Sequence, residues 1–217
     1  LLFLVSIFGT VLNGQAKGLL PMAKPEAVGL DPKKLEAVNE KMEALIEDNR
    51  LTGGTVVIAR KGKVAHFETY GLRNREEELP VKKDTIFRIY SMTKAITSVA
   101  ALMLAEEEKL DLDDPLSKFF PPLKKMKVWK DGNLIDTERE ATVADLLRHT
   151  SGLTYGWMSS KPIREALRSA GVLDRNKKLV PMMNGMSEVP LQFQPGSDWV
   201  YGCSTDVLGG VVEVASG

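Results

Sequence analysis

The chain is poor in cysteine and histidine, and this scarcity limits the chemistry open to it. Cys203 is its single cysteine, so an intrachain disulfide cannot form. His66 and His149 are its only histidines, and no group of Cys and His has the spacing of zinc ligands. We therefore expect neither a disulfide framework nor a metal, and the sequence indicates no other cofactor.

The chain also lacks an excess of charge of either sign. Its 29 basic and 29 acidic residues give a formal net charge of +0, which removes the long-range attraction that nucleic acid and anionic membranes usually exert on their binding proteins. No apolar stretch reaches the ~20 residues that a transmembrane helix needs. We expect a small-molecule substrate as the partner, with no nucleic acid and no stable membrane span.

The first residues form a short apolar segment. Leu1 to Leu12 are almost wholly apolar, and Gly14 and Ala16 place small residues at positions −3 and −1 of a cleavage site. Residues 1–16 are therefore interpreted as the remains of a signal peptide, which favours a periplasmic or secreted protein, although a buried N-terminal strand or helix stays open. We interpret residues 17–217 as one partial domain, cut at both ends.

The first part of that domain alternates helix and strand patterns. Asp31 followed by Pro32 is typical of a helix start, and apolar residues then recur at helical spacing to about residue 50. Residues 55–59 and 64–70 favour a β-hairpin, and residues 85–89 a further short strand. From Ser91 the chain turns into a helix so uniformly apolar that we expect it to be buried in the centre of the domain.

The second part is predicted to be mostly helices and loops. Asp131-Gly132 between two short β-type segments is typical of a type I′ hairpin, Thr142 begins a short helix, and residues 204–215 form a final apolar helix. The whole pattern indicates an α/β protein of the α+β type, in which helices flank an antiparallel sheet and a helical region is added.

The chemically suggestive motif is Ser91-Met92-Thr93-Lys94. One helical turn places the lysine beside the serine, and a helix N-terminus favours negative charge developing there. Burial favours the neutral amine of a lysine, which can then serve as a base or as part of a proton relay. Serine and lysine are common here, so this spacing arises by chance about once in such a sequence. Tyr201 can act as a further base or acid if it lies near the lysine, and otherwise as a half-buried aromatic residue.

Three separated segments resemble one known family. Residues 87–97 (FRIYSMTKAIT) resemble the nucleophile segment of class C β-lactamases, DD-peptidases and family VIII esterases. Residues 145–153 (DLLRHTSGL) and 194–201 (QPGSDWVY) are similar to two further family segments and occur in the same order. The resemblance implies a β-lactamase/transpeptidase-like fold with Ser91, Lys94 and Tyr201 as catalytic residues. It implies a structural role for His149.

The resemblance also has two departures. The β-lactamases place an asparagine two residues after the tyrosine, where its amide holds the substrate amide, whereas this chain has Cys203. This favours ester substrates over lactams or peptides. The family's third motif, on a late strand that supplies an oxyanion-hole donor, would follow Gly217. We therefore expect the C-terminal strands to be missing and the 217 residues by themselves to be inactive.

These observations predict a serine hydrolase, most of all a carboxylesterase, that works through an acyl-enzyme. A β-lactamase or D-alanyl-D-alanine carboxypeptidase remains the alternative. A second alternative is a catalytically silent relative that binds peptidoglycan or associates with itself. A Ser-His-Asp hydrolase is disfavoured because no serine stands in a Gly-x-Ser-x-Gly elbow.

Overall fold

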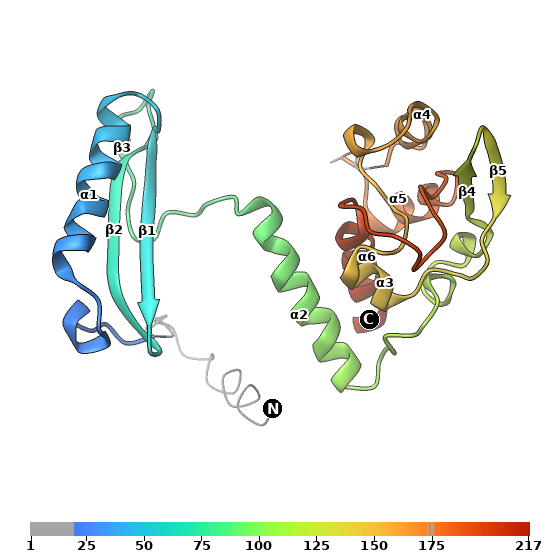
Figure 1. Cartoon of the computed structure of the whole chain (residues 1–217), viewed down its shortest axis with the longest axis horizontal. Helices are drawn as coiled ribbons and strands as arrows, with labels where there is room; N and C mark the ends of the chain where they lie inside the picture. The colour runs from blue at the N-terminus through green and yellow to red at the C-terminus, as the bar shows by residue number, and fades with distance from the viewer. Residues whose placement is uncertain (1–19, 173, 175) are drawn as a thin grey trace. The chain divides into compact units, whose positions relative to one another are not determined.

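A computed structural model describes residues 20–172, 174 and 176–217. The chain forms two compact units, Leu1–Arg88 and Ile89–Gly217 (Figure 1). The predicted signal peptide at residues 1–16 lies outside the described residues.

The first unit is a helix on a small antiparallel sheet. Its elements are η2 (Pro25–Val28), α1 (Pro32–Glu47), β1 (Gly53–Arg60), β2 (Lys63–Asn74) and β3 (Leu79–Pro80). The strand order is β1-β2-β3, and α1 lies along the sheet and contacts β2 (Figure 1).

Local sequence explains the helix and the hairpin of this unit. The Asp31 side chain accepts a hydrogen bond from the backbone N–H of Lys33 at 2.9 Å, and Pro32 occupies the first helical position, as predicted. Lys61 and Gly62 both have positive φ, 52° and 68°, as a two-residue type I′ turn requires. The predicted helix and hairpin are thereby confirmed.

The prediction of a strand at residues 85–89 is wrong. The backbone N–H of Thr85 bonds to the carbonyl of Lys82 in a turn, and the Thr85 hydroxyl accepts from the N–H of Lys82. In the part of the chain that the structure describes, residues 86–89 pair with no strand. Their β-branched and aromatic side chains favour extended backbone, but a strand also needs a hydrogen-bonded neighbour.

The second unit is mainly helical. Its elements are η3 (Tyr90–Met92), α2 (Thr93–Glu106), η4 (Leu116–Lys118), η5 (Pro121–Lys125), β4 (Lys127–Lys130), β5 (Asn133–Asp136), α3 (Val143–Arg148), η6 (Gly156–Met158), α4 (Lys161–Ser169), α5 (Leu179–Met186) and α6 (Ser204–Ser216). β4 and β5 form the predicted hairpin, with φ of 49° at Asp131 and 86° at Gly132. The predicted helices at 142–149 and 204–215 correspond to α3 and α6.

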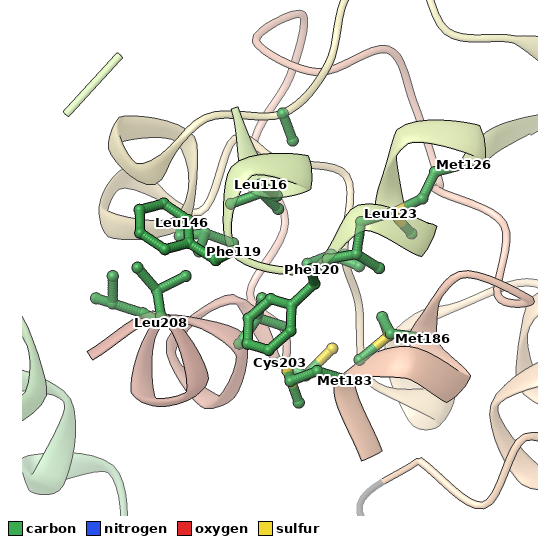
Figure 2. Close-up of a cluster of buried hydrophobic side chains, with 14 of the residues drawn as sticks. Leu116, Phe119, Phe120, Leu123, Met126, Leu146, Met183, Met186, Cys203 and Leu208 are labelled. Atoms are coloured by element: carbon green, nitrogen blue, oxygen red, sulfur yellow. The ribbon is translucent and has the colours of Figure 1, made fainter. Parts of the chain in front are cut away.

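The core of the second unit surrounds α6. Val207, Leu208 and Val211 of this helix are fully buried. They belong to one cluster with Phe120, which directly precedes η5, and Met183 from α5, and Figure 2 shows part of this cluster. Burying such side chains contributes about 1.5–3 kcal/mol each, so α6 is a main source of this unit's stability.

The expectation that the helix after Ser91 is buried all round is wrong. α2 packs against α6 through one face, on which Ala101 and Leu104 are buried. Ile96 is 62% exposed and Val99 51%. The apolar pattern identified a helix correctly, but a partner along one face covers only the side chains that point to it. Among the described residues, no helix combines the length and apolar character needed to cross a membrane.

Candidate active site

Ser91 lies at the junction between a 3-10 turn and α2. Tyr90, the residue before it, has φ of 45°, a left-handed conformation that bulky residues rarely adopt. Such strain persists only where surrounding contacts enforce it, and it is common at functional sites. Ser91 itself is exposed. The turn therefore presents its hydroxyl at the N-terminal end of the helix.

The three predicted catalytic side chains lie together. The Ser91 Oγ and the Tyr201 hydroxyl are 2.6 Å apart in a short hydrogen bond. The Lys94 Nζ lies 3.4 Å from the same Oγ and 4.9 Å from the centroid of the Tyr201 ring. Residues separated by 110 positions in the chain thus meet at one oxygen atom.

The surroundings of Tyr201 make its phenol more acidic than an ordinary tyrosine. The Lys94 ammonium is the main cause of the lowered pKa, and the hydrogen bond with Ser91 adds to it. Burial and the carboxylate of Asp206 oppose this effect without cancelling it. Tyr201 is therefore the group in this cluster that is best placed to take the Ser91 proton.

Backbone contacts hold the segment that carries Tyr201 against the loop after α3. The N–H of Val200 donates to the carbonyl of His149 at 3.1 Å, and the N–H of Gly196 donates to Thr150 at 2.8 Å. Gly202 approaches the same loop so closely that a Cβ there would lie 2.3 Å from the Leu153 carbonyl oxygen. Two of the three family-like segments therefore pack directly on one another.

The loop after α3 is in turn fixed by a buried carboxylate. Asp145 is fully buried and accepts two hydrogen bonds from Arg139, at 2.6 and 3.0 Å. It also accepts from the N–H of Thr142, in a capping box, and from the hydroxyl of Thr150 at 2.8 Å. Burial opposes its ionisation, but these donors outweigh burial and lower the pKa of Asp145.

His149 lies beside Tyr201, and the structural role that the resemblance implied for it stays a prediction. It ends α3 with φ of 59°, and its ring packs on Tyr201 at 5.2 Å between centroids. Burial, and then the charge of Lys94, lower the pKa of His149. The ring is therefore neutral near pH 7 and supports the phenol through packing.

The structure also brings in two residues that the sequence analysis missed. The hydroxyl of Tyr155 donates to Asp206 Oδ2 at 2.9 Å, and its ring meets Tyr201 edge-on at 5.8 Å. Lys94 Nζ lies 6.0 Å from the centroid of the same ring. Tyr155 follows the motif at 145–153 by two residues, and Asp206 lies in the first turn of α6. Their nearness to recognised motifs was the only signal in the sequence.

Cys203 lies in the core of the second unit. Its thiol is fully buried in the hydrophobic cluster of Figure 2 and donates to the Thr154 carbonyl at 3.4 Å. Burial raises the pKa of this thiol to about 12. Position 203 therefore offers no amide to a substrate, and the preference for esters over lactams stays a prediction.

The arrangement is suited to nucleophilic chemistry without a metal ligand set. An exposed serine, a phenol of lowered pKa and a lysine meet within hydrogen-bonding reach, which are the parts that covalent catalysis requires. No group of three or more Cys, His, Asp and Glu side chains that could hold a metal ion occurs within residues 20–172, 174 and 176–217.

The chain is similar to several known proteins. A family model described as Beta-lactamase matches residues 38–217. Esterase EstB from Burkholderia gladioli is 34% identical over 197 residues, which cover 89% of this chain and 48% of that protein. The ML-236A carboxylate methylbutanoyltransferase mlcH from Penicillium citrinum is 31% identical over 177 residues, covering 76% and 41%.

A solved structure is similar as well. EstCE1, a hydrolase with promiscuous acyltransferase activity, matches with a TM-score of 0.71 and 28% identity, over 85% of this chain and 47% of that chain. The chain thus spans about half the length of these relatives.

Proposed function

The chain belongs to the beta-lactamase family of serine hydrolases, and from this premise we propose that it is an esterase whose nucleophile is Ser91. Its fold is the β-lactamase/transpeptidase-like fold, with mixed helices and antiparallel sheets. Esterase and acyltransferase relatives support hydrolase chemistry at the level of the family.

One observation carries the assignment of the site. The Ser91 Oγ is 2.6 Å from a phenol whose pKa is lowered and 3.4 Å from the Lys94 Nζ. A serine hydroxyl becomes an effective nucleophile only when a nearby base removes its proton. Tyr201 as phenolate is that base, and Lys94 stabilises the phenolate through its positive charge.

Acylation follows from these positions. Tyr201 accepts the Ser91 proton while the Ser91 oxygen forms a bond to the ester carbonyl carbon, which gives a tetrahedral oxyanion. The backbone N–H of Ser91, at a helix start where such groups lack intrahelical acceptors, serves as one donor to this oxyanion. When the intermediate collapses, the bond to the alcohol oxygen breaks and Tyr201 returns the proton to the leaving alcohol.

Deacylation repeats the sequence with water. Tyr201 takes a proton from water as the water oxygen attacks the acyl carbon, and then returns it to the Ser91 oxygen as the acid leaves. Over both steps, one ester and one water are converted into one acid and one alcohol.

Mass spectrometry of the full-length protein after treatment with a fluorophosphonate tests the nucleophile. We expect one covalent adduct on the peptide that contains Ser91, and no adduct in Ser91→Ala. Labelling that survives Ser91→Ala would disprove the assignment.

A substrate panel separates the alternatives. Short p-nitrophenyl esters are the expected substrates. Efficient turnover of a chromogenic cephalosporin or a D-alanyl-D-alanine peptide without ester hydrolysis would favour the lactamase or peptidase alternative. A silent binder would turn over none of the three.

Acyl transfer is a second candidate, and the relatives favour it. The name of mlcH describes a methylbutanoyltransferase, and EstCE1 is described as a hydrolase with acyltransferase activity. The same acyl-enzyme can be resolved by an alcohol in place of water. Product analysis with a short primary alcohol present would then yield a new ester in addition to the acid, whereas a strict hydrolase yields the acid alone.

Export is a further proposal. The apolar segment and the small residues at 14 and 16 support a signal peptide at residues 1–16 and a periplasmic or secreted location. N-terminal sequencing of the mature protein, recovered from cell fractions, tests it. A mature chain that retains these residues in the cytoplasm would contradict it.

A further inference from the structure

Tyr155 occupies a central place between the elements of the site. Its ring contacts Tyr201 edge-on, at 5.8 Å between centroids, and Lys94 Nζ lies over it at 6.0 Å. Its hydroxyl bonds to Asp206 on α6. One side chain therefore connects the loop after α3 to the lysine of α2, the phenol of the site and the helix at the centre of the core.

The Tyr155 ring has one further aromatic neighbour. Trp157 stacks on it with centroids 4.5 Å apart and planes 15° apart. Burial, and then the charge of Asp206, raise the pKa of Tyr155 well above its usual range. The phenol therefore stays protonated and remains a donor to the carboxylate at any pH at which the site works. An aromatic ring fixed at its edge and at its face is a rigid neighbour.

Building on the proposed function, we propose that Tyr155 and Asp206 form a positioning pair that holds Tyr201 and Lys94 in register with Ser91. The Tyr201 ring packs against the Tyr155 ring, and the Lys94 ammonium lies over it. The hydrogen bond to the Asp206 carboxylate holds Tyr155 to α6. Neither residue has a direct contact with Ser91 among the bonds of the described chain, so both act through other residues.

Asp206 also sets a charge balance around the phenol. The groups that face Tyr201 are Lys94 and Ser91 from α2 and the turn before it, His149 from the end of α3, Tyr155 from the next loop and Asp206 from α6. The histidine is neutral near pH 7 and Tyr155 is protonated. The charges that act on the phenol are therefore those of one cation, Lys94, which lowers its pKa, and one anion, Asp206, which raises it.

Two conservative substitutions test the hydrogen bond of Tyr155 separately from the negative charge of Asp206. Tyr155→Phe removes only the hydroxyl and leaves both the ring and the carboxylate. Asp206→Asn keeps an oxygen that can accept from Tyr155 but removes the negative charge. The matched control is Tyr70→Phe in the first unit, which likewise removes a tyrosine hydroxyl that donates to a side-chain oxygen, that of Asn39.

The experiment is steady-state hydrolysis of p-nitrophenyl acetate by the full-length protein across pH. Tyr155→Phe is expected to lower kcat about tenfold with KM within about twofold. Without its bond to Asp206 the ring is less fixed, which displaces Tyr201 and Lys94 from Ser91 more than it weakens substrate binding. Asp206→Asn is expected to move the acidic limb of kcat/KM to lower pH, since loss of the anion makes the phenol easier to ionise. The double variant should lose no more than Tyr155→Phe does, as residues acting as one unit are not additive.

Three results would overturn the pair. The first is a Tyr155→Phe variant with the kinetics of Tyr70→Phe. The second is a loss of kcat in Tyr155→Phe that is fully accounted for by the fraction of unfolded protein, measured by circular dichroism. The third is an acidic limb that stays in place in Asp206→Asn, which also decides the matter if Tyr155→Phe does not fold. Absence of fluorophosphonate labelling at Ser91 in the unmutated protein would instead overturn the proposed function itself. If the Tyr155 and Asp206 variants are labelled at Ser91 and have unchanged kinetics, only the positioning pair is overturned.

Discussion

Two helices of the second unit, α2 and α6, are both rich in apolar residues but differ in how much of their surface is buried. α6 is buried along most of its length and carries the core of the unit, whereas α2 buries Ala101 and Leu104 and leaves Ile96 and Val99 exposed. Ser91, the proposed nucleophile, lies directly before α2, and α6 packs against α2. Apolar composition therefore indicates a helix but does not say what covers it.

The chemistry assigned to the α2 end is tested most strongly at Tyr201. Tyr201→Phe removes the hydroxyl that lies 2.6 Å from Ser91 Oγ and keeps the ring that packs on His149. We expect kcat/KM for ester hydrolysis to fall by about 10²- to 10⁴-fold, the range of a lost general base. An unchanged melting temperature would show that the loss is chemical, and full activity would remove Tyr201 from the mechanism.

The supporting role of α6 predicts a stability effect that depends on position. Leu208→Ala empties a fully buried site and is expected to lower the free energy of unfolding by about 2–5 kcal/mol. Val214→Ala, on an exposed position of the same helix, should change it by less than about 0.5 kcal/mol. Urea unfolding of the full-length protein measures both. Equal effects would contradict the assigned burial.

The ion pair between buried Asp145 and half-exposed Arg139 gives a pH-dependent prediction. Because the folded state lowers the pKa of Asp145, its contribution to stability is present above the ordinary carboxylate pKa of about 3.9 and is lost as pH falls through the lower, folded-state value. Arg139→Gln removes the cation that is hydrogen-bonded to this buried carboxylate, while Arg148 stays 3.8 Å from it, and should cost about 1–3 kcal/mol at pH 7.

The measurement for this variant is the free energy of unfolding as a function of pH. The difference between Arg139→Gln and the unmutated protein should shrink below about pH 4, where the carboxylate becomes protonated. A difference that stays constant with pH would assign the effect of Arg139 to packing.

The smallest effect on activity is expected at Cys203. Its thiol is buried and its raised pKa of about 12 keeps it protonated, so it should react with a thiol reagent only as fast as the protein opens. Cys203→Ala should leave ester hydrolysis within about twofold and cost about 1 kcal/mol of stability. Rapid labelling of the native protein would place the thiol at the surface and restore it as a residue of the site.

The sequence contained most of the local structure and the central residues of the site. The Asp31 cap, the Asp131-Gly132 turn and the Thr142 cap are local signals, and the element that each of these three predicts was found. Ser91, Lys94 and Tyr201 were predicted from ordered motifs, and the structure places them together, while their catalytic roles stay predictions. What could not be predicted depends on contacts between distant segments.

Those contacts explain the wrong predictions as well as the missed residues. The strand at residues 85–89 needed a partner that no local pattern reveals. The Tyr155 to Asp206 bond joins positions 51 residues apart. The direction of the Cys203 side chain follows from how α6 enters the core, which the family motif alone does not give.

The close approach of Gly202 to the loop after α3 has a consequence for how this site can evolve. Any side chain at position 202 would collide with backbone atoms that cannot move without displacing that loop. We therefore expect no substitution of Gly202 to be tolerated. Changes in specificity must arise elsewhere around the site, and a saturation library at this codon should return glycine alone among its active clones.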